Sequence, residues 1–317
     1  MSACFSEKDI DLIGLIYEAA SMIPSGMVST YGDIAAALGD KKASRAVGDV
    51  LSRGERPPEV PTHRVVYSTG EIGRGPAAEL RAKRLDEEGI QLRNGRVQGL
   101  AAARFADFDI EPVLVRLRKE QDDIAERAVL RDDPQEPCRI AGLDVSYQGD
   151  DAFAAVSIMD RRTGEIVEER TSRCKVRFPY IPTYLTYREL PPLRSLVRDA
   201  PGTVYLVDGH GVLHPRRAGI ASHIGVALDV PTVGAAKSLL VGEVDDVEAE
   251  RSPIRLGGEV AGCMLRHGRK AAFVSPGHRT SLRRAVALCS EALQRGIPAP
   301  LRRAHELANE VRREAYA

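Results

Sequence analysis

The stretch 203–229, TVYLVDGHGVLHPRRAGIASHIGVALD, constrains the fold of this chain more than any other part of the sequence. Its apolar run Val204–Val207 predicts a short buried strand, and Asp208 stands where that strand ends. Gly209 and Gly211 then mark a loop. Because open α/β sheets bind ligands at the carboxyl ends of their strands, Asp208 is a candidate site residue. An aspartate that merely caps the next helix is the alternative.

Composition limits the classes of protein to which the chain can belong. Its 317 residues exceed what one hydrophobic core usually supports, which predicts two domains. Lys plus Arg and Asp plus Glu both number 45, so the net charge gives no argument for nucleic-acid binding. The cysteines are scattered without a C-x-x-C pair, which indicates reduced thiols and a cytoplasmic protein. We expect no membrane partner, because no apolar run approaches roughly 20 residues and the N-terminal stretch is too charged for a signal peptide.

The N-terminal part is predicted to be mainly helical. An amphipathic segment, Tyr31–Leu38, ends at Gly39, and a second short helix is expected over Ala43–Leu51. Two short helices joined by a tight turn that contains glycine predict a helix-turn-helix, here in a winged-helix-like domain. This signal is weak by itself, because many all-α domains contain such a pair.

Three motifs of this part, VSTYGDIAAALG, ASRAVGDVL and VPTHRVVYSTGEIG, resemble the DNA-binding domain of the O6-alkylguanine-DNA alkyltransferases. The stretch LDEEGIQLRNGRV is similar to the tail of the alkyltransferase-like proteins, and the resemblance covers roughly residues 6–100. It implies that Tyr31 helps to rotate a nucleotide out of the duplex and that Arg45 fills the gap left in the stack. A tyrosine at the core edge and a solvated arginine are the alternatives.

Position 62 departs from that family. Thr62 stands where the family's P-C-H-R motif carries the acceptor cysteine, and a hydroxyl is a far weaker acid than a thiol of pKa about 8.5. His63 and Glu88 match the family's His–Glu pair and could still orient a water or a hydroxyl. We therefore expect residues 1–100 to bind and flip O6-alkylguanine without repairing it, with Thr62 and His63 beside the flipped base.

A second domain is expected over residues 111–317, after a linker at 101–110. The stretch NGRVQGLAAARFADFD loses clear periodicity, and a polar helix is predicted over Glu111–Arg131. From Arg139 onward, three strand-like runs are followed by alternating helices and strands. This order predicts an α/β domain with a mixed sheet and a ribonuclease H-like fold.

Three carboxylates of this domain predict a metal site. Asp144 lies within a strand, Glu189 on a helix and Asp208 at a strand end. Buried carboxylates on neighbouring strands repel one another, and a divalent cation would offset that cost. Oxygen ligands favour Mg²⁺, with Mn²⁺ as a substitute, over zinc. Such a cluster suits phosphodiester hydrolysis, with Lys237 adding positive charge near the transition state. Each carboxylate alone is better explained as a cap or a surface charge.

Four motifs of the second domain resemble endonuclease V: GLDVSY, FPYIPTYLTYRELPPL, VYLVDGHGVLHPRRAGIASHIGVALDVPTVGAAKS and FVSPGHRTSLRRAV. The resemblance runs from roughly Glu111 to the C-terminus. It implies Mg²⁺-dependent nicking of DNA 3′ to deoxyinosine, displaced by one nucleotide and leaving 5′-phosphate ends. Carried onto matching positions, the catalytic residues are the three metal carboxylates Asp144, Glu189 and Asp208 together with His214 and Lys237.

The same resemblance assigns residues that contact DNA. Tyr180 is implied as the wedge that fills the gap left by the lesion, since an aromatic face can stack on an exposed base. Gly209 and Gly211 are implied to line the pocket for the hypoxanthine ring, because a backbone without Cβ can approach it closely.

Some candidates are weaker. His305, in RAHELANE, matches a histidine near the active site of some family members, although a surface histidine on a helix explains it about as well. His278 and Arg279 are candidates for phosphate contact, with a simple loop turn as the alternative. A local basic face for the duplex, or else a solvated charged face, would comprise Arg266, His267, Arg269, Lys270, Arg279, Arg283 and Arg284.

These expectations describe a two-domain DNA repair protein. Its partners would be double-stranded or single-stranded DNA that carries deaminated or alkylated bases. Three alternatives stay open: an inosine-specific endoribonuclease, because contacts to 2′-hydroxyls cannot be read from a sequence; a lesion-binding scaffold with a silent nuclease half; and a genuine alkyltransferase. No protein partner can be deduced.

Overall fold

The computed structural model describes residues 10–53 and 56–317, which divide into two compact units. The N-terminal unit comprises Ile10–Lys119 and the segment Arg177–Pro182, and the C-terminal unit comprises Glu120–Val176 and Thr183–Ala317. Residues 101–110, the predicted linker, fall within the N-terminal unit, and the chain passes into the C-terminal unit within helix α6 (Val113–Arg127). Among the described residues, no helix has the length and apolar character needed to span a membrane.

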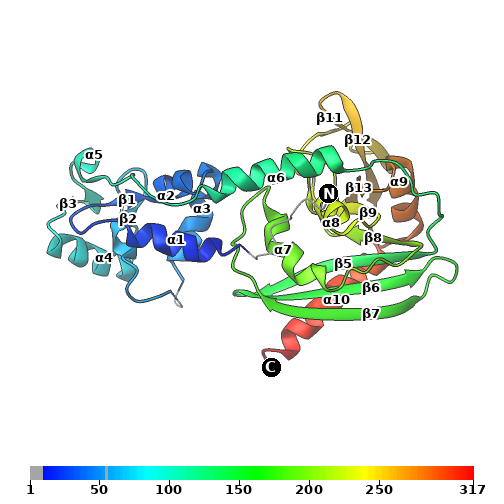
Figure 1. The fold of residues 1–317 in the computed structure, drawn as a ribbon, viewed down its shortest axis with the longest axis horizontal. Coiled ribbons are helices and arrows are strands. Elements are labelled where there is room, and N and C mark those ends of the chain that lie inside the picture. Colours follow the sequence, from blue (N-terminus) through cyan, green and yellow to red (C-terminus); the bar gives the residue numbers. More distant parts are fainter. Residues whose placement is uncertain (1–9, 54–55) are drawn as a thin grey trace. The chain divides into compact units, whose positions relative to one another are not determined.

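The N-terminal unit is mainly helical (Figure 1). Its helices are α1 (Leu12–Ser21), α2 (Tyr31–Ala37), α3 (Ser44–Leu51), α4 (Pro76–Glu87), α5 (Leu100–Ala103) and the first part of α6, with 3-10 turns η1 (Lys41–Ala43) and η2 (Thr62–Arg64). Its strands are very short: β1 (Ser29–Thr30) pairs in parallel with β2 (Val65–Val66), and β3 (Leu92–Arg93) pairs antiparallel with β4 (Arg96–Val97).

Helices α2 and α3 form the helix pair that the sequence predicts. A capping box starts α2, because Thr30 Oγ1 accepts a hydrogen bond from the Asp33 N–H (3.0 Å) and Asp33 Oδ2 accepts one from the Thr30 N–H (3.1 Å). Val47 and Val50 of α3 are buried, whereas Arg45 in its first turn is exposed. The apolar side of α3 therefore packs into the unit and leaves Arg45 accessible to a ligand.

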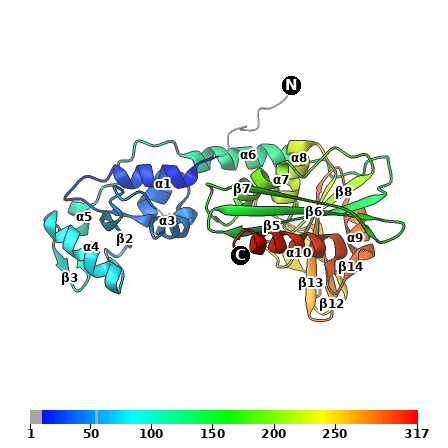
Figure 2. The ribbon, with the colours of Figure 1, turned by 90° about the horizontal axis from the view of Figure 1, so that it is seen from below.

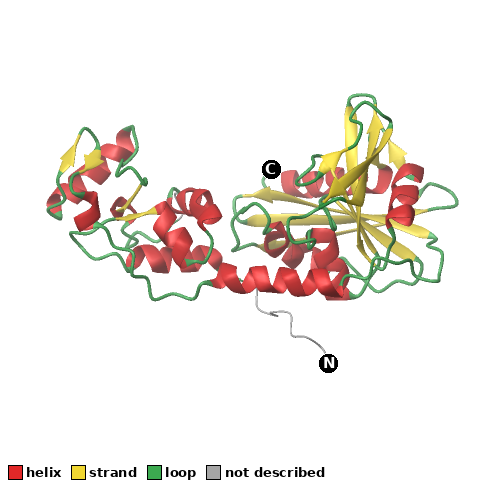
Figure 3. Ribbon diagram, turned by 90° about the horizontal axis from the view of Figure 1, so that it is seen from above, coloured by secondary structure: helices red, strands yellow, loops and turns green. Residues whose placement is uncertain are grey.

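A nine-stranded mixed sheet forms the middle of the C-terminal unit (Figure 3). The strand order is β10-β11-β12-β13-β9-β8-β5-β6-β7. The pairs β5–β8 and β8–β9 are parallel, and the other pairs are antiparallel. The strands are β5 (Arg139–Gln148), β6 (Asp151–Asp160), β7 (Ile166–Lys175), β8 (Thr203–Val207), β9 (Thr232–Ala236), β10 (Glu243–Val244), β11 (Arg251–Leu256), β12 (Glu259–His267) and β13 (Lys270–His278).

Helices cover both faces of this sheet (Figure 2). Helices α7 (Leu185–Arg194) and α8 (Ile220–Leu228) share an apolar cluster with Leu143 of β5. Helices α9 (Leu282–Glu291) and α10 (Ala299–Glu314) share another with Ile140 of the same strand. Because successive side chains of a strand point to opposite faces, the two clusters lie on opposite sides of the sheet. A small hairpin, β14 (Leu293–Gln294) and β15 (Ile297–Pro298), joins α9 to α10.

Gly142 allows α10 to pack directly against β5. A Cβ at this position would lie 2.3 Å from the backbone carbonyl carbon of Pro300, a distance that no side chain could tolerate. Asp144, two residues further along β5, points to the same face of the sheet as Gly142. The close approach therefore fixes the first turn of α10 beside the strand that carries Asp144.

Candidate functional site

Asp144 lies next to a histidine of helix α10. His305 Nδ1 is 2.6 Å from Asp144 Oδ2, and Asn309 Nδ2 lies 3.2 Å from His305 Nε2. Ser146 donates a hydrogen bond to Asn309 Oδ1 at 3.0 Å. The structure thus brings His305 to the predicted site and adds Asn309, which sequence reasoning missed. In the sequence, the only sign that Asn309 would accompany His305 is their spacing of four residues, which places them one helical turn apart on the same face of α10.

Asp208 follows β8 and is paired with Lys237, which follows the adjacent strand β9. Lys237 Nζ lies 2.5 Å from Asp208 Oδ2. Burial alone would lower the pKa of Lys237, but the charge of Asp208 and this hydrogen bond outweigh it, so the pKa of Lys237 is raised. The lysine therefore stays protonated beside the carboxylate at neutral pH.

Glu189 of α7 completes the set of carboxylates. Burial raises the pKa of Glu189 well above its ordinary value, and the charges of Asp144 and Asp208 raise it further. Burial and the charge of Asp208 likewise raise the pKa of Asp144, although His305 opposes that shift. The charge of Asp208 therefore disfavours ionisation of Asp144, and the charges of both disfavour ionisation of Glu189.

The donor chemistry of this set fits a divalent cation, but its spacing does not form a finished metal site. Across residues 10–53 and 56–317, no group of three or more His, Cys, Asp or Glu side chains is arranged so that it could hold a metal ion. Two of the carboxylates are instead held by bases, Asp208 by Lys237 and Asp144 by His305. Glu189 projects from α7, whose apolar side packs on the face of the sheet opposite to α10. The shared ion that the sequence predicts therefore has no preformed set of three ligands among the described residues.

His214 is engaged on both ring nitrogens. Its Nδ1 accepts a hydrogen bond from the Arg216 N–H at 3.2 Å, so Nε2 carries the proton and donates to the Thr183 carbonyl at 3.1 Å. Burial lowers the pKa of His214 to about 4, which keeps the ring neutral. The arrangement gives His214 a role in holding Thr183 and leaves neither nitrogen available to a reacting group.

The two glycines predicted to line a base pocket pack tightly against the protein interior. A Cβ on Gly211 would lie 2.0 Å from the Pro276 carbonyl oxygen, and a Cβ on Gly209 would lie 2.4 Å from Cγ2 of Ile220. Close approach of chain segments within the fold, rather than an open recess, explains why glycine is needed at both positions. Their part in binding a base stays a prediction.

His278 does not lie on a phosphate-binding surface, which corrects that interpretation. It is 5 % exposed; its Nδ1 accepts a hydrogen bond from the Val129 N–H at 3.2 Å, and its Nε2 lies 3.3 Å from Asp229 Oδ1. Arg279 pairs with Asp133 at 2.8 Å. Both side chains tie the segment after α6 to the sheet. In the predicted basic face, Arg266 and Arg284 are also paired with carboxylates, so part of its charge is compensated.

Tyr180 is 63 % exposed, although Phe178 and Ile181 beside it are buried. The buried residues on either side of Tyr180 anchor the chain there, while Tyr180 itself is exposed to solvent. Contacts within the chain place Tyr180 in the segment Arg177–Pro182 of the N-terminal unit.

The N-terminal unit contains a cavity of about 160 Å³ beside Thr62. Its lining residues are Leu51, Ser52, Arg56, Thr62, His63, Ala77, Leu80, Arg81 and Arg84. Arg81 Nη1 donates to the hydroxyl of Tyr31 at 3.2 Å, which places Tyr31 next to the cavity. His63 Nε2 lies 2.8 Å from Glu88 Oε1, so the structure brings the predicted His–Glu pair together.

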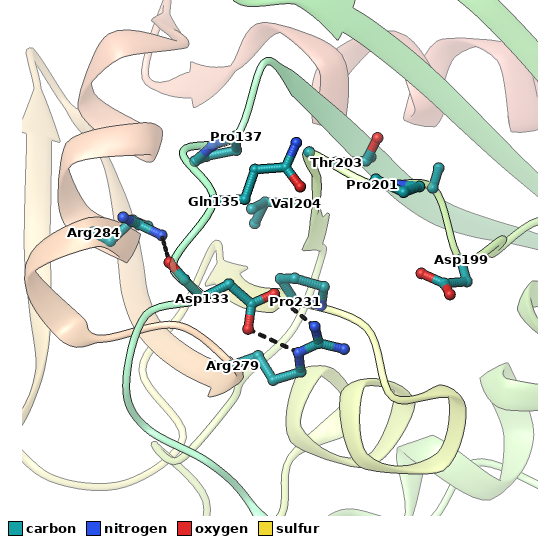
Figure 4. A pocket seen from close by; sticks show the side chains of 12 residues that line it. Asp133, Gln135, Pro137, Asp199, Pro201, Thr203, Val204, Pro231, Arg279 and Arg284 are labelled. Atoms are coloured by element: carbon teal, nitrogen blue, oxygen red, sulfur yellow. Dashed lines mark hydrogen bonds and ion pairs between the residues drawn. The ribbon is translucent and has the colours of Figure 1, made fainter.

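A larger cavity, of about 280 Å³, lies at the start of β8, the strand that Asp208 follows (Figure 4). Thr203 and Val204, which begin β8, line it, whereas Asp208 follows the last residue of that strand. Arg279 and Asp133, which form an ion pair, are both among the residues that line it. This cavity is therefore separate from the carboxylates.

Comparisons with known proteins agree with this division. The family described as endonuclease V matches residues 122–306, and the DNA-binding domain of 6-O-methylguanine DNA methyltransferase matches residues 14–90. A bifunctional methyltransferase/endonuclease of Picrophilus torridus is 36 % identical, over 96 % of this chain and 98 % of that protein. The endonuclease V structure from Streptomyces avermitilis is 34 % identical with a TM-score of 0.59, over 64 % of this chain and 94 % of that one.

The fold, the carboxylate site and these likenesses define a DNA repair endonuclease joined to a lesion-binding module. The chain belongs to the endonuclease V family. Its N-terminal module is related to the alkyltransferases, but Thr62 lacks the thiol that accepts an alkyl group, so this module is not expected to be catalytic.

Proposed function

We propose that the protein is a Mg²⁺-dependent endonuclease that nicks DNA 3′ to deoxyinosine. Its N-terminal module would bind and flip O6-alkylguanine without repairing it. The observation that carries the nuclease half is the placement of Asp144 against His305 and of Asp208 against Lys237, with Glu189 near enough for the charges of Asp144 and Asp208 to raise its pKa. The strand order β7-β6-β5-β8-β9, with only its last two pairs parallel, supports a ribonuclease H-like arrangement.

The domain limits are part of this proposal. We take residues 1–100 as the alkyltransferase-like module, 101–110 as the linker and 111–317 as the nuclease. The helix pair α2–α3 supports a winged-helix-like module. Arg45 is exposed in the first turn of α3, as a residue inserted into a duplex must be.

The chain's own residues would prepare the phosphodiester for hydrolysis. Mg²⁺, or Mn²⁺ in its place, would be held by Asp144, Glu189 and Asp208; when bound, such an ion polarises the phosphate and activates a water. Lys237, protonated beside Asp208, can offset the negative charge that develops on the phosphate. His305 orients Asp144 and can move a proton at its Nε2 once Asn309 releases that atom.

Tyr180 and Arg45 would serve base flipping in the two halves. Extruding a base costs a few kcal/mol, least at mispaired or damaged sites, and a side chain that fills the gap offsets part of that cost. Tyr180 is exposed and anchored by buried neighbours, as a wedge requires. Tethering the two modules raises the local concentration of the nuclease near alkylated bases. We infer that the first module delivers the second to such lesions.

A nicking assay tests this function. Duplexes with inosine, uracil, xanthine or O6-methylguanine, and matched inosine RNA, are incubated with Mg²⁺ and with wild-type protein or Asp208→Ala. We expect cleavage of inosine DNA that Asp208→Ala nearly abolishes. Asp245→Ala is the matched control, because Asp245 pairs with Arg255 away from the site. Full activity of Asp208→Ala would refute the metal site, and preference for the RNA would favour an endoribonuclease.

The coupling of the two modules needs its own measurement. Binding of the full chain to an O6-methylguanine duplex, and nicking of that duplex, are compared with Arg45→Ala and Tyr31→Ala. We expect both variants to weaken binding to the alkylated duplex and to leave nicking of a plain inosine duplex unchanged. A chain that neither binds nor nicks the alkylated duplex would show that the coupling is wrong.

A further inference from the structure

Thr183 adopts a backbone conformation that threonine rarely takes. Its φ is +71°, in the left-handed region where a Cβ crowds the backbone. Two side chains hold its carbonyl oxygen: Gln121 Nε2 donates to it at 2.6 Å and His214 Nε2 at 3.1 Å. A strained residue that is fixed from two sides indicates a turn whose geometry matters.

Gln121 is placed for this contact alone. The side chain is 1 % exposed, and its Oε1 has no hydrogen-bond partner among the described residues. Because Thr183 offers a carbonyl, the amide nitrogen must face it, so the orientation of the amide is settled by its partner. Burying an amide with half of its hydrogen-bonding capacity unused is unfavourable. An apolar side chain would fill the same space without that penalty, which points to a role beyond stability.

The turn at Thr183 lies between two parts of the proposed machinery. The segment Arg177–Pro182, which carries the exposed Tyr180, ends immediately before it. Helix α7, which carries Glu189, begins two residues later at Leu185, and its N-cap Tyr184 makes no side-chain capping bond. The first turn of α7 therefore follows directly on the turn at Thr183, so the conformation of that turn sets where the helix begins.

We propose that Gln121 and His214 are positioning residues for nicking: by holding the Thr183 carbonyl, they fix the turn that leads into α7, the helix that carries Glu189. This inference rests on the proposed nuclease function. His214, to which the sequence resemblance gives a catalytic role, then acts through Thr183. Gln121 lies outside every motif that carries the resemblance, and it holds the same Thr183 carbonyl as His214 does.

The test uses the full chain with Gln121→Met, which keeps the side-chain length and removes the donor. The matched control is Thr232→Val, because Thr232 Oγ1 donates a buried bond of the same kind, at 2.7 Å, to the Ala221 carbonyl. The rescue variant is Gln121→Met with Thr183→Gly, since glycine adopts positive φ without strain. Single-turnover nicking of inosine DNA and amide hydrogen exchange over residues 183–187 are measured for each, well below the unfolding temperature.

We expect Gln121→Met to slow nicking about tenfold, the equivalent of one lost hydrogen bond, and to speed exchange over residues 183–187. The added Thr183→Gly should recover part of the rate, and Thr232→Val should keep the wild-type rate. Unchanged nicking and exchange in Gln121→Met, or an equal loss in Thr232→Val, would overturn the proposal. If the wild-type chain nicks no inosine substrate, the proposed nuclease function is wrong. The hydrogen-exchange result then still shows whether Gln121 holds the turn at Thr183.

Discussion

His305 donates through Nδ1 to Asp144 Oδ2 at 2.6 Å, a contact between residues that are 161 positions apart. Asn309 Nδ2 can only donate, so its approach to His305 Nε2 makes that nitrogen the acceptor and leaves the ring proton on Nδ1. The tautomer that binds Asp144 is thus selected within α10 itself.

Replacing His305 by alanine should slow the nicking of inosine DNA. A hydrogen bond to a charged group contributes about 1.5–3 kcal/mol, so the single-turnover rate should fall by about tenfold to a hundredfold. Glu306→Ala is the matched control, because Glu306 is exposed on the same helix and lies 4.0 Å from Arg303 rather than against Asp144. Equal nicking rates in the two variants would show that His305 has no role in the reaction.

Gly211→Ala should destabilise the C-terminal unit. The new methyl group would lie 2.0 Å from a backbone oxygen of Pro276, and backbone cannot move aside as a side chain can. We expect a loss of about 3 kcal/mol or more in the free energy of unfolding, measured by urea denaturation. The comparison is Gly149→Ala, which meets no atom within 4 Å and has φ +59°, so its cost should be only about 1 kcal/mol. If the two variants lost similar free energies of unfolding, the loop that carries Gly211 would have to move aside to accommodate the methyl group.

Local sequence patterns predict the elements of this fold better than the contacts between them. The apolar run before Asp208, the Thr30–Asp33 cap and the alternation over residues 165–176 are set by neighbouring residues, and the structure contains the corresponding elements. Strand β11 was not predicted from the sequence; Pro253 lies inside it, and proline within a run argues against a strand. Its alternating buried and exposed residues show that an antiparallel strand tolerates it here.

The site was predictable by residue type but not by geometry. Asp144, Glu189 and Asp208 could be chosen because carboxylates that come together from a strand, a helix and a strand end are costly to bury without a role. Whether His305 lies on the surface or beside Asp144 depends on how closely α10 approaches β5, which Gly142 decides through a contact with Pro300. The burial of His278 and the hydrogen bonds of both His214 ring nitrogens likewise depend on tertiary packing, and the neighbouring residues in the sequence do not indicate them.

Glu88 should make the stability of the N-terminal unit depend on pH. Burial raises the pKa of Glu88, but hydrogen bonds from Arg64 and His63 outweigh it and hold that pKa at about 2, below the ordinary 4.5. A carboxylate whose folded pKa is depressed stabilises the fold above the unfolded pKa, and this contribution is lost as the pH falls through the folded pKa. The stabilisation is therefore complete above about pH 4.5 and gone near pH 2.

The measurement compares Glu88→Gln with the wild-type chain. Urea unfolding, followed by the loss of helical signal, should show the variant about 1–2 kcal/mol less stable at pH 7, once solvent screening of the ion pairs is allowed for. The gap should narrow progressively as the pH approaches 2, because the wild-type carboxylate is then protonated as well. A gap of constant size from pH 7 to pH 2 would contradict the assignment.

Thr62→Cys should convert the N-terminal module into an alkyl acceptor. His63 Nε2 contacts the ionised Glu88, so that nitrogen carries the proton, and His63 Nδ1 is buried without a partner among the described residues. Nδ1 can thus accept the proton of a thiol at position 62, directly or through a water. Arg81 and Arg84 line the same cavity, and their positive charge favours the thiolate.

The wild-type chain should gain no mass from an O6-methylguanine duplex, because the Thr62 hydroxyl stays protonated at neutral pH. Thr62→Cys should gain one methyl group, and its thiol should react with an alkylating probe as though its pKa were below the usual value of about 8.5. Ser52→Cys is the matched control: Ser52 lines the same cavity but has no histidine beside it in the chain, so its thiol should behave ordinarily. Methyl transfer by the wild-type chain, or a Thr62→Cys thiol no more reactive than that of Ser52→Cys, would show that the unpartnered His63 nitrogen does not serve as the base.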